Sequence, residues 1–225
     1  MVMGLRRPAP SYSGAEDEDV SRLSDLNLPP DSFLMVIRRM VNSMKTEQPS
    51  FSRPERILED KMLEADRRMR NEIRLLELYP AFRVRIEKVI VSLEAKGIRP
   101  RIQDAWRSPA KQEKAFKSGH SQLLFGFHNV TASDGAPQAL AVDLVDDDSP
   151  LSPSKNYLLQ LAAAVEAAGL ITGIRWGLPE ELIGAIDAAI AAQDWDANVK
   201  AGWDPAHVQP TGISVAQAKA GMRPA

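Results

Sequence analysis

The chain has 225 residues, of which 44% are hydrophobic and 26% are charged, and its net charge is -2. Such a length and composition predict a soluble globular protein with one substantial core. The near-zero net charge gives no electrostatic reason to expect nucleic acid as a partner. The absence of cysteine excludes disulfides, a thiol nucleophile and thiolate metal ligands.

The N-terminal 54 residues divide into two segments. Residues 1–30 are rich in Pro, Ser, Gly and acidic residues, which predicts a flexible tail. They contain no apolar stretch of the kind found in secretory signals, so we expect synthesis in the cytoplasm without a signal peptide. No apolar run in the chain is long enough for a transmembrane helix, and we expect no stable membrane insertion.

Residues 31–54 are predicted to form an amphipathic helical extension, with Asp31 as its N-cap. Its basic residues leave a membrane-surface or partner-binding role open, but packing on the catalytic domain is the favoured interpretation. The apolar face consists of Phe33, Ile37, Met40, Val41 and Met44, and the basic residues are Arg38, Arg39 and Lys45.

The next part of the chain alternates between helical and extended patterns. Residues 55–78 are dense in good helix formers, and Pro80 separates them from a second helix that stops at Gly97. Residues 98–106 then have the pattern of a strand, and 110–118 that of a further helix.

The last third of the chain continues this mixture. Residues 139–145 are predicted to form a strand, followed by an amphipathic helix that ends at Gly169. Residues 180–193 form an Ala- and Ile-rich helix, and a turn-rich strand carries His207. The order predicts an α+β fold, with a small antiparallel sheet packed against helices and a helical N-terminal extension.

Two of the three histidines lie in segments that together suggest a metal site. His128 and Asp143 flank a polar loop, and His207 lies near the C-terminus. Two imidazoles and one carboxylate leave one position of a tetrahedral zinc ion free for water, as in catalytic sites. We therefore predict His128, Asp143 and His207 as Zn²⁺ ligands carried by the sheet. Asp204, three residues before His207, is the predicted general base.

Three sequence blocks resemble a known family. They are residues 105–109 with 111–112, residues 126–128 with 139–143, and residues 204–209. They are similar to the blocks G-[YW]-R-S-x-x-x-Q, S-x-H-x-x-G-x-A-x-D and [DE]-x-x-H-[FV]-[EQ] of the zinc peptidases that include D-alanyl-D-alanine carboxypeptidases and L-alanyl-D-glutamate endopeptidases, the family of VanY-like enzymes and phage endolysins.

The resemblance implies a zinc metallopeptidase domain over residues 55–212, followed by a C-terminal tail over 213–225. Asp at position 204, where carboxypeptidases of the family tend to have Glu, favours cleavage of the L-alanyl-D-glutamate bond of peptidoglycan stems. A D-alanyl-D-alanine carboxypeptidase or dipeptidase is the alternative within the family. The expected protein is a monomeric bacteriolytic hydrolase, an endolysin or an injected effector, that reaches the cell wall after release or delivery.

The same resemblance implies roles for the residues near the metal. Arg107 is expected to bind a substrate carboxylate or a developing oxyanion, because its planar guanidinium suits both. Ser108 and Gln112 belong to the same block and are expected to bind substrate with it. Zinc is expected to supply an activated water, from which Asp204 takes a proton.

The chain also departs from the family pattern. His128 and Asp143 are 15 positions apart, whereas the corresponding His and Asp of the family pattern are seven positions apart, which predicts an inserted loop over 129–138. Residues 178–200 form a second insertion. These departures leave open a third possibility, a non-catalytic wall-binding or virion structural protein.

Several further side chains have two interpretations each. His120 matches no motif ligand and is predicted to be a loop or groove residue. The acidic run 146–148 could bind calcium, but solvation is favoured. Trp176 and Trp203 are expected either to line a substrate groove or to pack in the core.

Overall fold

The structure of the protein, a computed structural model, describes residues 53–224. The predicted tail over 1–30 and most of the helical extension over 31–54 lie outside this range. None of the helices within the described range combines the length and the apolar character needed to cross a bilayer.

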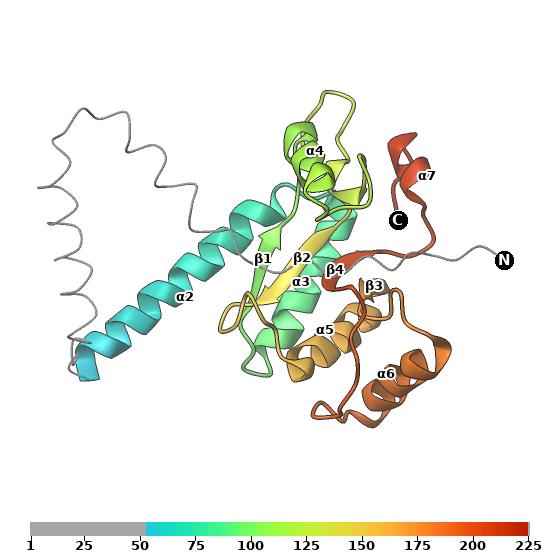
Figure 1. Cartoon of the computed structure of the whole chain (residues 1–225). Helices are drawn as coiled ribbons and strands as arrows, with labels where there is room; N and C mark the ends of the chain where they lie inside the picture. Colours follow the sequence, from blue (N-terminus) through green and yellow to red (C-terminus); the bar gives the residue numbers. More distant parts are fainter. Residues whose placement is uncertain (1–52, 225) are drawn as a thin grey trace, which may run out of the picture. The chain divides into compact units, whose positions relative to one another are not determined.

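The described chain forms one antiparallel sheet with helices around it (Figure 1). Neighbouring strands pair antiparallel in the order β1-β2-β4-β3, so the predicted α+β fold with a small antiparallel sheet is confirmed. In chain order the elements are α2 (Arg53–Leu75), α3 (Pro80–Glu94), β1 (Pro100–Asp104), α4 (Pro109–Lys117), the 3-10 helix η2 (Phe127–Asn129), β2 (Val142–Asp146), α5 (Lys155–Ala167), β3 (Leu170–Gly173), α6 (Glu180–Ala192), β4 (Asp204–Pro210) and α7 (Val215–Lys219).

The core lies between the sheet and helices α3 and α5, which pack on each other and on the strands. Helix α3 buries one face, and its Ile86 and Leu93 are fully buried. Burial of each such side chain contributes about 1.5–3 kcal/mol relative to leaving it exposed. The core residues of α3 are Phe82, Ile86, Val89, Ile90 and Leu93, and those of α5 include Leu158, Leu161 and Val165.

Strand β2 divides its side chains between the core and the opposite face of the sheet. Val142 and Leu144 are fully buried, whereas Asp143 between them is only partly buried. Since successive strand residues point to opposite faces, the two apolar neighbours fix Asp143 on the other face. This alternation places one predicted ligand on a rigid strand.

Three elements were not predicted from the sequence: the short 3-10 helix η2, strand β3 and helix α7. Strand β3 (Leu170–Gly173) begins directly after Gly169, which has a positive φ of 72° and reverses the chain after α5. Four residues are too few for a strand pattern to stand out. Helix α7 (Val215–Lys219) lies in the segment expected to be a tail, and its Ala218 is 2% exposed and belongs to the core.

The two segments predicted to be insertions, 129–138 and 178–200, lie in different places in the fold. The loop over 129–138 folds back on itself, since Thr131 pairs with Pro137 and the Gln138 N–H donates to the Val130 carbonyl at 3.0 Å. Arg223 donates to the Thr131 carbonyl at 2.7 Å. The insertion over 178–200 contains α6, which packs on α5.

Candidate metal centre

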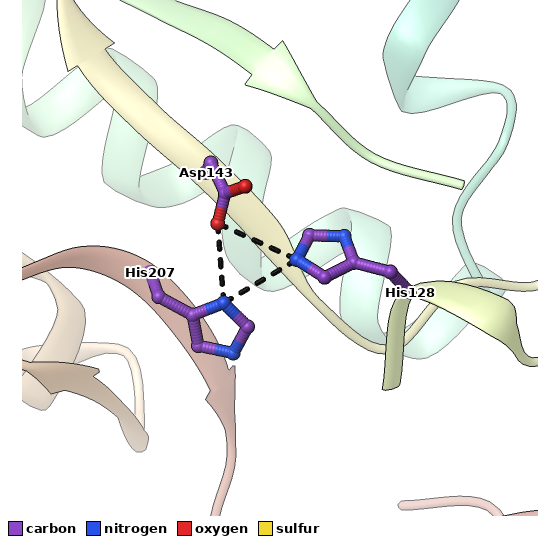
Figure 2. Close-up of side chains that lie close together, drawn as sticks. All are labelled: His128, Asp143 and His207. Atoms are coloured by element: carbon purple, nitrogen blue, oxygen red, sulfur yellow. Dashed lines mark hydrogen bonds and ion pairs between the residues drawn. The ribbon is translucent and has the colours of Figure 1, made fainter. Parts of the chain in front are cut away.

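Three predicted ligands meet on one face of the sheet (Figure 2). Nε2 of His128 lies 3.3 Å from Nδ1 of His207 and 3.4 Å from Oδ1 of Asp143. Nδ1 of His207 lies 3.1 Å from the same carboxylate oxygen. Among residues 53–224, this is the only group of three or more His, Cys, Asp or Glu side chains that could hold a metal ion.

Hydrogen bonds at the outer edges of both imidazoles set which nitrogen faces the centre. Nδ1 of His128 lies 2.6 Å from the Ala105 carbonyl oxygen, and Nε2 of His207 lies 3.2 Å from Oε1 of Gln209. Both partners are acceptors, so the neutral rings donate outward and turn a lone pair inward. Tautomers fixed in this way are typical of metal-binding histidines.

The inner atoms fit a zinc ion. Two imidazole lone pairs and a carboxylate oxygen face one another, and three acceptors at 3.1–3.4 Å repel unless a cation or proton lies among them. Zn–N and Zn–O bonds of about 2.0–2.1 Å give tetrahedral edges of about 3.3 Å. The three spacings therefore match one face of a tetrahedral zinc site, and the donor set leaves a fourth position open.

The backbone brings these ligands together by strand pairing and a short 3-10 helix. Asp143 on β2 is the direct partner of His207 on β4. His128 lies on η2, and its carbonyl accepts from the Arg107 N–H at 2.8 Å. Asn129 accepts from the Gly126 N–H at 2.8 Å and donates to the Arg107 carbonyl at 2.7 Å, which holds η2 against the chain after β1.

Arg107 lies beside the centre but directs its guanidinium at the protein. It donates to Asp104 at 2.8 Å and to Gln112 at 3.0 Å, and contacts Oδ2 of Asp143 at 3.5 Å. Oδ2 is the oxygen turned away from the histidines, so Arg107 orients Asp143 and leaves Oδ1 facing them. The guanidinium of Arg107, which was expected to bind substrate, therefore already has partners within the protein.

The two other expected substrate-binding residues also make internal contacts. Ser108 is the N-cap of α4, and its hydroxyl accepts from the Lys111 N–H at 3.3 Å. Gln112 is 2% exposed, and its amide donates to Ser121 and to the Leu123 carbonyl. These contacts hold α4 and the following loop in place.

Asp204, the predicted general base, lies at the edge of the centre. Its Oδ2 lies 3.9 Å from Nδ1 of His207. Partial burial, together with the negative charge of Asp143, raises the pKa of Asp204 above its usual value. A raised pKa makes a carboxylate a stronger base, which suits proton transfer near neutral pH.

Close backbone packing sets the position of Asp204. Gly173 on β3 pairs with Asp204, and a Cβ on Gly173 would lie 2.1 Å from the Asp204 carbonyl oxygen. A Cβ on Gly202 would lie 2.6 Å from the Gly173 oxygen. Only glycine allows these approaches, so both positions fix the start of β4.

The charges at the centre favour a cation there. Burial opposes ionisation of Asp143, but His128 and His207 outweigh it and hold the pKa of Asp143 well below its usual range. Burial alone would lower the pKa of His128, and Asp143 reverses the direction and raises it. Both shifts reflect an attraction for positive charge at the point where the three side chains meet.

The structure shows the partners of His120 and of the acidic run 146–148. His120 is exposed, and its Nδ1 lies 2.8 Å from the Ser118 hydroxyl. Of the acidic run, Asp147 pairs with Arg99 and Arg101, and Asp148 pairs with Arg99, so arginines balance these two charges.

The two tryptophans lie together beside the centre. The ring of Trp176 lies 5.3 Å from that of His207 and 5.3 Å from that of Trp203. Trp203 is 54% exposed. An exposed aromatic side chain at the edge of a site is available to a ligand.

Three residues of the site had no predicted role. Asp104 anchors Arg107, Asn129 holds η2, and Gln209 orients His207. Gln209 had a signal in the sequence, because residues two apart on a strand share a face. Asp104 and Asn129 act through contacts between separate segments, and the sequence carries no local pattern for these.

No known family profile matches the chain. No curated protein matches it either. Among solved structures, the crystal structure of the Serratia marcescens L-Ala D-Glu endopeptidase ChiX is similar over 63% of this chain and 86% of that one, with 23% identity and a TM-score of 0.41. A TM-score of this size does not establish a common fold.

Proposed function

We propose that this protein is a zinc-dependent peptidoglycan hydrolase that cleaves the bond between L-alanine and D-glutamate in the peptide stem. The observation that carries the proposal is the meeting of three acceptor atoms beside the half-buried carboxylate of Asp204. The sequence blocks around Arg107, His128 and His207 support a peptide-stem substrate, because they resemble the blocks of peptidases with that specificity.

Each residue of the centre has a defined part in this reaction. His128, Asp143 and His207 would hold the ion through Nε2, Oδ1 and Nδ1. A zinc ion held there would act as a Lewis acid, lowering the pKa of a bound water and polarising a carbonyl group. Asp204 takes a proton from the attacking water and passes it to the leaving amine. Arg107 keeps Asp143 oriented.

A D-alanyl-D-alanine carboxypeptidase or dipeptidase is the second candidate. Lys111 and Lys114 lie in a cleft that reaches Asp143, and their ammonium groups also suit the terminal carboxylate that a carboxypeptidase recognises. The two candidates share the metal centre and differ in the bond that is cleaved.

Digestion of purified peptidoglycan by the zinc-loaded full chain, with mass spectrometry of the fragments, separates the candidates. We expect sugar chains that retain only L-alanine, and free peptides that begin with D-glutamate. Loss of terminal D-alanine alone would assign the carboxypeptidase. Binding to the wall without release of fragments, unchanged in His128→Ala and Asp204→Asn variants, would assign a non-catalytic wall-binding protein.

A further inference from the structure

A cleft of about 550 Å³ lies beside the metal centre, between α4 and β1. Its volume falls within the range of sites that take small ligands or part of a peptide. The charged and titratable side chains that line it are Asp104, Arg107, Lys111, Lys114, His120 and Asp143. We refer to it as the α4 cleft.

The charges lining the α4 cleft favour an anion. The two carboxylates, of Asp104 and Asp143, both contact the guanidinium of Arg107. Lys111 and Lys114 lie one turn apart on α4 and both face the cleft. The exposed Lys111 makes no ion pair with any residue between 53 and 224, so its ammonium group is available to a ligand.

The strand order gives the metal centre two unlike sides. Strand β1, with the α4 cleft, lies on one side of Asp143, and β4 and β3 lie on the other. That second side carries Asp204 and the aromatic pair of Trp176 and Trp203. A substrate bound across the centre would therefore meet cationic groups at one end and aromatic rings at the other.

We propose that the α4 cleft binds a carboxylate on the C-terminal half of the substrate, with Lys111 as its main contact. This inference rests on the proposed peptidase function. In the L-alanyl-D-glutamate reaction, the leaving half begins with D-glutamate, whose α-carboxylate is attached to the same carbon as the scissile nitrogen. This carboxylate would lie next to the metal centre, on the α4 side. The sugar-bearing half then extends toward Trp176 and Trp203.

Binding of product-like peptides to the zinc-loaded full chain tests this directly by calorimetry. The probe is a tripeptide that begins with γ-linked D-glutamate. It is compared with two derivatives, one amidated at the α-carboxylate of D-glutamate and one amidated at the C-terminus. Lys111→Ala should weaken binding of the acid by about 3- to 10-fold, as expected for one charge-assisted contact near the surface.

The control variant is Lys117→Ala on the same helix. Lys117 pairs with Glu113 at 2.7 Å and does not line the α4 cleft, so its removal should leave binding unchanged. Lys111→Arg should restore binding of the acid. Higher salt should weaken binding of the acid more than it weakens binding of a derivative that lacks the recognised carboxylate.

One of the two amidated derivatives should bind wild type more weakly than the acid does, and Lys111→Ala should not weaken its binding further. The carboxylate that is amidated in this derivative is the one that the α4 cleft recognises. Equal binding of the acid and both amides, or an equal effect of Lys111→Ala on all three peptides, would overturn the proposal. The proposed function fails separately: if the protein releases no peptidoglycan fragments yet binds the acid through Lys111, the cleft's ligand class stands and the hydrolase does not.

Discussion

Two clusters of polar and charged side chains in this molecule differ in whether their hydrogen-bond donors and acceptors match. The Arg67 cluster, made of Glu64, Arg67, Glu94 and Arg99, joins α2, α3 and the start of β1. Arg67 is 2% exposed and donates to Glu64, to Glu94 and to the Pro100 carbonyl, so the donors and acceptors match. In the metal centre, the two ring nitrogens and the carboxylate oxygen that face one another are all acceptors when both imidazoles donate outward to Ala105 and Gln209.

This difference separates a structural cluster from a functional one. A buried ion pair with all its hydrogen bonds made is complete and leaves nothing for a ligand. A buried group of like acceptors is incomplete and gains stability only when a cation binds. The Arg67 cluster should therefore control the stability of the fold, and the metal centre should control activity.

The largest expected effect on activity comes from Asp204→Asn. The amide keeps the size of the side chain but cannot accept the proton, so hydrolysis should fall by about 10²- to 10⁴-fold. Zinc content should not change, because Asp204 is not among the three ligands. Turnover of peptidoglycan and metal content are measured on the same preparation. Activity within tenfold of wild type would refute the general-base role.

In the structural cluster, Arg67→Met should lower the free energy of unfolding by about 2–3 kcal/mol, because it removes the one buried member of the cluster together with its bonds to Glu64, Glu94 and the Pro100 carbonyl. Urea denaturation measures this change. Arg68→Met is the matched control, since Arg68 is exposed and also pairs with Glu64, and it should cost less than about 1 kcal/mol. Equal costs would show that the buried cluster contributes no more than a surface pair.

An intermediate effect is expected from Arg107→Lys. A lysine cannot hold Asp104, Gln112 and Asp143 together, so zinc affinity should fall by about 10- to 100-fold. Competition with a chelator gives the affinity. If Arg107→Lys leaves the zinc affinity unchanged and raises KM, Arg107 binds substrate, as expected from the sequence, and does not orient Asp143.

The smallest effect concerns acid stability. Hydrogen bonds from Arg67, acting against partial burial, lower the pKa of Glu64 from 4.5 to about 2. The stability that Glu64 contributes is therefore complete above pH 4.5 and is lost as pH falls toward 2. Because Glu64 is partly exposed, we expect a contribution of about 1 kcal/mol. Glu64→Gln should make the free energy of unfolding less dependent on pH between about 4.5 and 2. The same pH dependence in the variant and in wild type would show that Glu64 makes no such contribution.

The sequence predicted which side chains meet at the candidate metal centre better than it predicted the contacts that orient them. The meeting of His128, Asp143 and His207 was predictable because few residue types bind zinc and because three sequence blocks resemble, in order, those of a zinc peptidase family. Strand alternation around Asp143 then made its orientation predictable as well. In contrast, the chain carries no signal that Arg107 contacts Oδ2 of Asp143, since these residues are 36 positions apart and meet only in the folded chain.

The helices and strands of the fold were likewise predictable only where the sequence has a local pattern. Helices α3, α5 and α6 were predictable because each has a long amphipathic or apolar pattern. Strand β3 was missed because its four residues follow Gly169 without a pattern of their own. The position of the chain over 129–138 also depends on a distant residue, Arg223.

The most direct test of the central claim is the zinc content of the full chain after exhaustive dialysis, measured for wild type and for Asp143→Ala and Asp147→Ala. Asp143 and Asp147 lie on or next to β2, but only Asp143 faces the two histidines. We predict one zinc ion per chain in wild type and in Asp147→Ala, and close to none in Asp143→Ala. Equal zinc content in all three, or none in wild type, would contradict a metal centre at His128, Asp143 and His207.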